Sequence, residues 1–264
     1  MLLLIDADSA FYRAGFANET REYLCTLDGE LMGTFQYKKD ADAFAEEHGC
    51  DVEQHSEAGP VGLSLYNLRN CIDSMLSLSH TGYEMYYGGK GNYRYDVFPE
   101  YKANRKDVGK PKHLEQMKKH LQAQCGAIPV DGEEADDRVS WRQMQCIEEG
   151  IESCIVTIDK DLDNTPGWHF NWVKGGDPYY VSPEQADLNF YRQLLTGDKT
   201  DGIPGIPGLG KKTAEKILPE WSEDMLDIVM RTYKDKDLSM EYLKQQGVAL
   251  WMRRKPNEMW SYNG

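Results

Sequence analysis

The sequence predicts an α/β fold with a central, mostly parallel sheet flanked by helices. Short apolar runs, which are typical of fully buried strands, alternate along the chain with longer segments of helical periodicity. Two of these runs, Leu2–Ile5 and Ile155–Ile158, are followed at once by aspartates. The chain has 264 residues, 40% of them hydrophobic, which suffices for one large domain or for a main domain with a smaller one.

Each element follows from the local pattern, taken in chain order. Leu2–Ile5 is the first strand, and Asp28-Gly29 between two β-prone stretches indicates a hairpin inside a polar insertion at residues 20–58. Apolar residues at steps of three and four predict a helix from Val61 to Leu76. The other strands are expected at residues 84–87, 128–130, 155–158 and 179–181, and the other helices at residues 37–49, after Pro111, at 133–147 and from Pro183. From about Leu195 onward the chain is expected to be helical with glycine-rich turns.

The charge balance is acidic but uneven. The formal net charge of −14, taken alone, argues against a general nucleic-acid binder. One strip departs from this average and carries the basic residues Lys102, Arg105, Lys106, Lys110, Lys112, Lys118 and Lys119. No apolar run approaches the length of a membrane span or of a secretion signal, and none of the six cysteines forms a CxxC pair. We therefore expect a cytoplasmic protein with free thiols and no membrane partner.

Carboxylates cluster at four short sites. Asp6 follows the first strand, and Asp159 and Asp161 follow the strand at residues 155–158. Because the carboxyl ends of parallel strands meet at one edge of a sheet, these side chains are expected to lie together. The full set comprises Asp6, Glu134, Asp136, Asp137, Asp159, Asp161, Asp198 and Asp201. Any one cluster is equally well read as a helix turn or a solvated loop, but together they favour a cation site.

A cation is expected because carboxylates that are brought together repel one another. Ligands that are all carboxylate oxygens favour a hard ion, Mg²⁺ or Mn²⁺. Two such ions about 3.5–4 Å apart are the usual arrangement for in-line attack on a phosphodiester.

A glycine-rich segment, residues 197–214, reads GDKTDGIPGIPGLGKKTA. Gly208 and Gly210 precede a predicted helix that starts with Lys211 and Lys212. Backbone N–H groups at such a point, together with two lysines, favour an anion such as a phosphate. The segment lacks the GxxxxGK[ST] pattern of an ATP-binding loop, and the plainer alternative is a turn between two helices.

Five stretches occur in a fixed order: LLLIDADSAFYR (2–13), FPEYKANRK (98–106), DGEEADD (131–137), TIDKDLD (157–163) and GDKTDGIPGIPGLGKKTA (197–214). In this order they resemble the 5′→3′ exonuclease and flap endonuclease family, in particular its bacteriophage members and the exonuclease domain of bacterial DNA polymerase I. The resemblance implies a PIN-like flap-nuclease fold with an α/β domain at residues 1–195, which includes the insertion at 20–58 and a helical arch at about 99–125. It also implies a helical region at residues 196–264 with a helix–three-turn–helix, or helix-hairpin-helix, DNA-binding element at 197–219.

The same resemblance implies an activity and roles for single residues. The activity is metal-dependent cleavage of phosphodiester bonds near the 5′ ends of duplex or branched DNA, by a two-metal-ion mechanism and with RNA–DNA hybrids as a further substrate. The eight carboxylates match the family's metal ligands, and Asp6, Asp136, Asp159, Lys102 and Arg105 match its catalytic residues. The positions expected to contact DNA are Tyr101 as a stacking surface, Lys102, Arg105, Lys106, Gly205, Gly208, Gly210, Lys211 and Lys212. A monomer, a K⁺ ion at the glycine-rich turn and, for a phage-encoded protein, the cytoplasm of a bacterial host are also implied.

One position departs from the family pattern. Many members carry a further aspartate after the second strand, where this chain reads YYGGKGNYR (86–94) with Gly89 near the expected place. This departure supports an alternative, a catalytically impaired protein of the same fold that binds DNA structures without cleaving them. A phosphatase of the haloacid dehalogenase type explains Asp6 and Asp8 but not the glycine-rich segment, and an RNA-cleaving relative of the same fold class is a third alternative.

Overall fold

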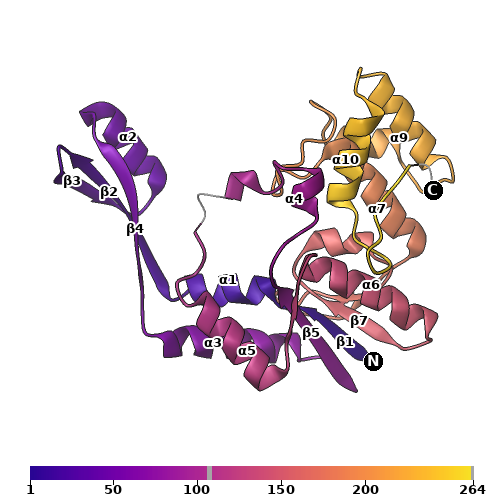
Figure 1. The fold of residues 1–264 in the computed structure, drawn as a ribbon, viewed down its shortest axis with the longest axis horizontal. Helices are drawn as coiled ribbons and strands as arrows, with labels where there is room; N and C mark the ends of the chain where they lie inside the picture. The colour runs from indigo at the N-terminus through magenta and orange to yellow at the C-terminus, as the bar shows by residue number, and fades with distance from the viewer. Residues whose placement is uncertain (106–108, 263–264) are drawn as a thin grey trace. The chain divides into compact units, whose positions relative to one another are not determined.

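The computed structural model describes residues 1–105 and 109–262 (Figure 1). The chain forms two compact units. Unit 1 consists of Met1–Ser9, Asp73–Gly109 and Leu121–Gly264, and unit 2 consists of Ala10–Ile72 and Lys110–His120. The carboxylates predicted to form a site all belong to unit 1.

Unit 1 is built on a six-stranded sheet with the strand order β6-β5-β1-β7-β8-β9. The strands are β1 (Leu2–Asp6), β5 (Gly82–Gly88), β6 (Ile128–Val130), β7 (Ser153–Val156), β8 (Gly167–Phe170) and β9 (Tyr179–Val181). All neighbours pair in parallel except β8 and β9. Leu3, Leu4 and Ile5 of the central β1 are fully buried, as a strand of a parallel sheet covered on both faces requires. The carboxyl ends of β1, β5 and β7 therefore open on the same edge (Figure 1).

Unit 1 also contains helices, several of which begin with a capping side chain. They are α4 (Arg94–Val97), η1 (Ala103–Arg105), α6 (Ala135–Glu148), η2 (Lys160–Asn164), α7 (Pro183–Thr196), α8 (Lys211–Ile217), α9 (Met225–Lys234) and α10 (Met240–Leu250). Glu134 and Asp137 form a capping box at the start of α6, and Ser182 caps α7 by accepting from the N–H of Gln185 at 3.2 Å. α7 to α10 enclose a second hydrophobic core that includes Leu194, Ile206, Leu218, Val229, Tyr233 and Leu243.

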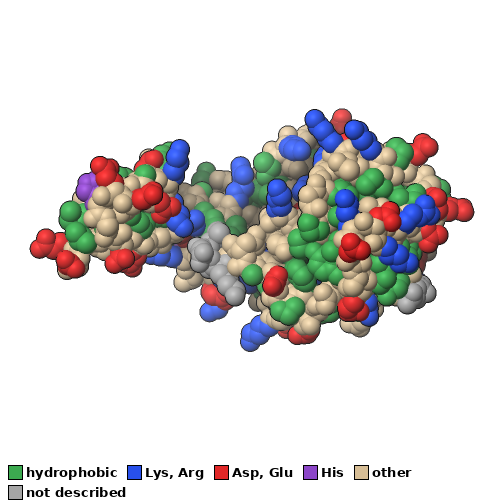
Figure 2. All heavy atoms as spheres, turned by 90° about the horizontal axis from the view of Figure 1, so that it is seen from above, with side chains coloured by type: hydrophobic (Ala, Val, Ile, Leu, Met, Phe, Trp, Pro, Cys, Tyr) green, Lys and Arg blue, Asp and Glu red, His purple; other side chains and the backbone are tan. Residues whose placement is uncertain are grey.

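Unit 2 contains the polar insertion. Its elements are most of α1 (Asp8–Phe16), β2 (Glu19–Leu27), β3 (Glu30–Phe35), α2 (Lys38–His48), β4 (Asp51–Ala58) and parts of α3 (Val61–Met75) and α5 (Leu114–Cys125). β2 and β3 meet at Asp28 and Gly29, which both have positive φ (52° and 84°), as a two-residue hairpin turn requires. Residues 19–58 hold eleven Asp and Glu against three Lys and Arg. Figure 2 shows acidic side chains over this part of the chain.

The α/β class with a mostly parallel sheet is confirmed, and so is the hairpin. The strand expected at Ile155–Ile158 is placed two residues too late: β7 ends at Val156, because Asp159 already caps η2 and Ile158 is 37% exposed. The insertion is larger than a hairpin, since β4 adds a third strand with the order β3-β2-β4. The division at residues 195/196 and the arch at residues 99–125, which includes three residues outside the described ranges, remain predictions.

Two further expectations concern cysteines and membranes. All six cysteines are free thiols, and Cys25, Cys71, Cys146 and Cys154 are buried. Across residues 1–105 and 109–262, no helix combines the length and the hydropathy that crossing a membrane requires.

We expect Gly197→Ala to destabilise the protein far more than Gly175→Ala. Both glycines have a positive φ, 68° and 65°, and Gly197 in addition has a ψ of −172°, a combination that is essentially restricted to glycine. A Cβ at Gly197 would lie 2.2 Å from the Ile203 carbonyl oxygen and 2.5 Å from the Gly205 nitrogen, whereas nothing lies within 4 Å of one at Gly175. In thermal unfolding followed by circular dichroism, the Tm of Gly197→Ala should be lower by at least ~4 °C than that of Gly175→Ala. Equal losses would show that the contact of the two glycine backbones does not matter.

Candidate active site

Asp6, Asp136 and Asp159 form the first group of carboxylates at the sheet edge. Asp6 is the last residue of β1, is 3% exposed and accepts hydrogen bonds from the Asp8 N–H (3.0 Å) and the Thr157 hydroxyl (3.2 Å). Burial, followed by the charges of Asp8 and Asp159, raises the pKa of Asp6 to about 7. Burial and the charges of Asp6 and Asp159 also raise the pKa of Asp136 well above its usual value. Asp6 and Asp159 thus lie near each other at the sheet edge, and Asp136 from α6 lies near both.

Asp161 and Asp198 form the second group. Burial and the charges of Asp159 and Asp198 raise the pKa of Asp161 to about 8, and its carboxyl hydrogen-bonds to Asp198. For Asp198, burial favours the neutral form, but hydrogen bonds from Asp161 and from the N–H groups of Thr200 (2.6 Å) and Asp201 (3.3 Å) outweigh it and lower its pKa. The Gln193 amide donates to both carboxylates. These opposite pKa shifts favour a proton shared by the two acids and carried by Asp161.

Glu134 and Asp201 lie next to these groups and pair with the predicted basic residues. The Lys102 ammonium is 2.5 Å from Glu134 Oε1 and 3.6 Å from Asp201 Oδ2, and the Arg105 guanidinium also pairs with Asp201. Although burial favours neutral Lys102, the charges of Glu134 and Asp201 outweigh it and raise its pKa. Lys102 has a φ of 55°, an unusual backbone conformation for a lysine, held by a hydrogen bond from its N–H to the Asp201 carbonyl (2.8 Å). Lys102 and Arg105 are thus fixed beside the carboxylates.

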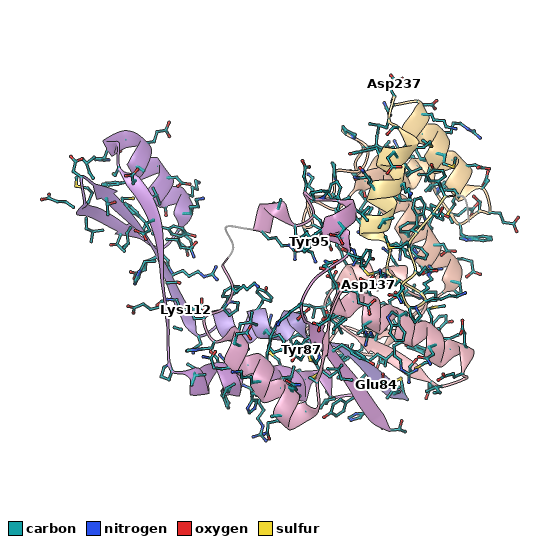
Figure 3. All side chains as sticks on the ribbon, in the orientation of Figure 1. Glu84, Tyr87, Tyr95, Lys112, Asp137 and Asp237 are labelled. Carbon is teal, nitrogen blue, oxygen red and sulfur yellow. The ribbon has the colours of Figure 1, made fainter. Side chains whose placement is uncertain are left out.

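Asp137 is held by an arginine that sequence reasoning missed. Arg94 is fully buried, and both its terminal nitrogens bond to the Asp137 carboxylate, with Nη2 at 3.0 Å from Oδ1. The Arg94 guanidinium also donates to the carbonyls of Ala249 (2.8 Å) and Trp251 (2.8 Å), and Nη1 is 3.4 Å from Glu134 Oε2. Asp137 therefore anchors α4 and the end of α10 to the start of α6, instead of lying with the acids at the sheet edge (Figure 3). The signal that could have indicated this role is the capping-box spacing of Glu134 and Asp137.

The donor chemistry suits a hard divalent cation, but the side chains do not converge. Among the described residues, no group of three or more His, Cys, Asp or Glu side chains is arranged closely enough to hold a metal ion. Mutual repulsion opposes a closer approach of Asp6, Asp136 and Asp159, and a divalent cation would offset it. These three residues, with Asp161 and Asp198 beside them, fit the ion that the resemblance implies by their chemistry and proximity.

Tyr101 has a different place from the one expected of a stacking surface. It is 3% exposed and its ring belongs to the second hydrophobic core. Its hydroxyl lies 2.8 Å from Glu134 Oε2 and 2.9 Å from Asp201 Oδ2. Tyr101 therefore orients two carboxylates through its hydroxyl. Because the side chain is buried, its ring is not available for a base to stack on.

The remaining basic and glycine positions divide between buried and exposed sites. Gly205 is buried, where its N–H donates to Gln246 (3.0 Å) and a Cβ would lie 2.2 Å from the Gly197 nitrogen. It is thus a packing residue of the turn. Of the other positions expected to contact DNA in the glycine-rich segment, all four are exposed: Gly208, Gly210, Lys211 and Lys212. Lys106 lies outside the described residues, and Lys110, Lys112, Lys118 and Lys119 belong to unit 2.

Gly89 is required by the packing at the end of β5. Its N–H donates to the Val130 carbonyl at 2.7 Å, and a Cβ would lie 2.7 Å from that same oxygen and 2.2 Å from Asp131 Oδ1. Asp131 in turn accepts from the Lys90 N–H at 2.7 Å. An aspartate at this position would therefore need a shift of the backbone, so the departure from the family pattern is built into the local structure.

We expect Asp161→Asn to stabilise the protein at alkaline pH when divalent ions are chelated. The pKa of Asp161 is about 8 in the folded chain against 3.8 for an ordinary aspartate, so its ionisation destabilises the fold progressively as pH rises through this interval. An asparagine keeps a donor for Asp198 and cannot ionise. Melting curves in EDTA should give equal Tm values near pH 4 and a Tm higher by at least ~2 °C for the variant at pH 9. A lower Tm for the variant at pH 9 would contradict the shared proton.

We expect Arg94→Met to be strongly destabilising, because it leaves the buried Asp137 carboxylate without its cation. Breaking a buried ion pair from one side costs about 3–5 kcal/mol, whereas an exposed pair contributes about 0–1 kcal/mol. The matched control is Arg105→Met, since the Arg105 side chain is 44% exposed. Urea unfolding should show a loss of several kcal/mol for Arg94→Met and little change for the control. Similar losses in both variants would contradict the anchoring role.

Comparisons with known proteins find relatives in sequence and in fold. No family model matches the sequence. The chain is 34% identical to a thermostable DNA polymerase I of Thermus aquaticus over 150 residues, which are 49% of this chain and 17% of the polymerase. It is 31% identical to an exodeoxyribonuclease of enterobacteria phage T3 over 167 residues, 61% of this chain and 52% of that protein. The chain thus spans about half or less of the length of these curated relatives.

The fold has a solved counterpart in bacteriophage T5. The T5 flap endonuclease, in a structure described as a pseudo-enzyme–product complex with DNA and metal ions, matches with a TM-score of 0.54 and 15% identity. The match covers 95% of this chain and 93% of the T5 chain. At this identity the match shows the fold. The resemblance to the 5′→3′ exonuclease and flap endonuclease family is therefore confirmed: this chain is similar in sequence to DNA polymerase I and to a phage exodeoxyribonuclease, and it has the fold of the T5 flap endonuclease.

Proposed function

We propose that the protein is a divalent-metal-dependent 5′→3′ exonuclease and flap endonuclease that acts on DNA ends. One observation carries the proposal: carboxylates from β1, α6 and the start of η2 lie near enough at one sheet edge to raise one another's pKa, while Lys102 and Arg105 pair with Glu134 and Asp201 next to them. Cleavage of a phosphodiester uses both kinds of group, since carboxylates bind the metal ions and basic side chains bind the phosphate. A phosphatase of the haloacid dehalogenase type would leave Lys102, Arg105 and the glycine-rich turn without a role.

Asp6, Asp136 and Asp159 would hold one Mg²⁺ or Mn²⁺ ion, and Asp159, Asp161 and Asp198 would hold a second. When bound, such ions lower the pKa of a coordinated water and offset charge on the phosphate. This chain's own residues prepare the site: Thr157 and the Asp8 N–H orient Asp6, and Gln193 orients Asp161 and Asp198. Asp161 would have to release its proton on metal binding, so we expect occupancy to rise with pH around 8.

Lys102 and Arg105 would bind the scissile phosphate. Their present partners, Glu134 and Asp201, keep both cations charged and in place, and a phosphate oxygen can replace a carboxylate oxygen as acceptor. The left-handed backbone at Lys102 is a strained feature next to the site, of the kind that is retained where a side chain must be aimed. The hydrogen bond from the Lys102 N–H to the Asp201 carbonyl stabilises this conformation and joins the YKANR segment to the glycine-rich segment.

The duplex would be held by its backbone, not by its bases. Lys211 and Lys212 are exposed at the start of α8, next to the flexible positions Gly208 and Gly210. Contacts of this kind give binding that is independent of sequence and falls steeply with salt. We further infer a K⁺ ion at this turn, a monomeric protein and activity on RNA–DNA hybrids, all three from the family resemblance.

The decisive experiment is cleavage of 5′-labelled blunt duplex, 5′-flap and single-stranded DNA with Mg²⁺, Mn²⁺ or EDTA. We expect short 5′ products in the presence of either metal, and a loss of at least ~100-fold in rate in the Asp159→Ala/Asp161→Ala variant, since both proposed ions lose ligands. Asp163→Asn is the matched control, because this carboxylate follows in the same segment but accepts from the Tyr179 hydroxyl at 2.8 Å. Binding without cleavage in every metal would contradict the proposal and favour the impaired, DNA-binding alternative that Gly89 supports.

A further inference from the structure

Tyr95 is an exposed aromatic residue on α4. Its neighbours in sequence are turned inward: Arg94 is fully buried on Asp137, and Tyr93 lies against the guanidinium of Arg253 at 3.7 Å from the ring centroid. Tyr95 is 49% exposed, so α4 presents its ring to solvent (Figure 3). Because about half of Tyr95 is exposed, its ring is accessible to a ligand.

The surroundings of Tyr95 lead directly to the candidate site. Its ring packs edge-on against Tyr101, with a centroid distance of 5.8 Å and an interplanar angle of 64°. The hydroxyl of Tyr101 bonds to Glu134 and Asp201, and the Lys102 ammonium lies 4.8 Å from the Tyr101 ring centroid. A single side chain thus separates the exposed Tyr95 ring from the cation that is proposed to bind the scissile phosphate.

Other exposed aromatic residues of unit 1 have different contacts. Trp168 of β8 and Tyr180 of β9 pack on each other with a centroid distance of 5.3 Å, at the edge of the sheet that ends in β9. Tyr179 stacks on His169 and donates to Asp163. Among the ring contacts recorded for the described residues, the contact of Tyr95 is the one that leads to Glu134, Asp201 and Lys102.

We propose that Tyr95 stacks on a base of the nucleotide whose phosphate is bound at Lys102. The inference rests on the nuclease function proposed above and assigns the role that Tyr101, being buried, cannot fill. Aromatic stacking suits an enzyme that must accept any sequence, because every base has a flat π face. A ring that is fixed by an edge contact with Tyr101 loses little further freedom when a base stacks on it.

The test uses the full chain in the Asp159→Ala/Asp161→Ala background, so that DNA is bound without being cleaved. The probe is a duplex with a short 5′ single-stranded tail that carries 2-aminopurine at the nucleotides next to the junction. We expect binding to quench the probe, and Tyr95→Ala to remove most of the quenching and raise Kd roughly 5- to 150-fold. Tyr95→Phe should behave like Tyr95 because it keeps the ring, and Tyr180→Ala should have no effect because that ring, though 55% exposed, lies elsewhere.

Tyr95→Leu separates stacking from packing, since leucine keeps an apolar contact with Tyr101 but has no ring. Loss of quenching in Tyr95→Leu, with an unchanged melting temperature, would support the proposal. Equal quenching and equal Kd in the alanine, leucine and phenylalanine variants would overturn it. The nuclease proposal has a separate readout, because it fails if the protein with all its carboxylates does not cleave DNA in the presence of Mg²⁺ or Mn²⁺.

Discussion

Repulsion between carboxylates is the constraint on which the site, and much of unit 1, depends. The sheet delivers Asp6 and Asp159 to one edge, and the same edge receives Asp136 from α6. Three kinds of interaction reduce this repulsion. Asp161 keeps a proton between itself and Asp198, Glu134 and Asp201 take Lys102 and Arg105 as counterions, and Asp137 is neutralised in the interior by Arg94. Chemically equivalent groups thus acquire different roles from their neighbours, and the acids left without a counterion are those that suit a metal.

The sequence predicts features that depend on neighbouring residues in the chain or on the geometry of a parallel sheet. A short apolar run predicts β1 because a buried strand must be apolar on both faces, and the aspartate that follows predicts the edge where charges gather. Partners that are distant in the chain are not predicted. Arg94 and Asp137 are 43 residues apart, and no periodicity relates α4 to α6, so Asp137 could not be told from Asp136. The same reason hides the burial of Tyr101, whose cover comes from helices beyond residue 183.

Glycine positions illustrate a second limit of sequence reasoning. Gly205 and Gly208 stand three residues apart in one motif, yet the first allows two backbones to touch and the second is exposed. Composition treats them alike, because a missing side chain serves either close packing or an open turn. Gly89 belongs to the first kind, since the end of β5 presses on Val130 and Asp131. The glycine at this position is therefore explained by the close packing of β5 against the end of β6, and not by the carboxylates alone.

The insertion of residues 19–58 leaves and rejoins unit 2 at one point. Glu19 pairs with Ala58, the Gly59 N–H donates to the Asn18 carbonyl at 2.9 Å, and the Asn18 amide donates to Pro60 and Ser64. The forty residues thus begin and end side by side, since their first and last residues pair in one sheet. A segment joined in this way can vary in length and composition without a shift in the register of α1 or α3. Its acidic composition is therefore independent of the carboxylates at the sheet edge.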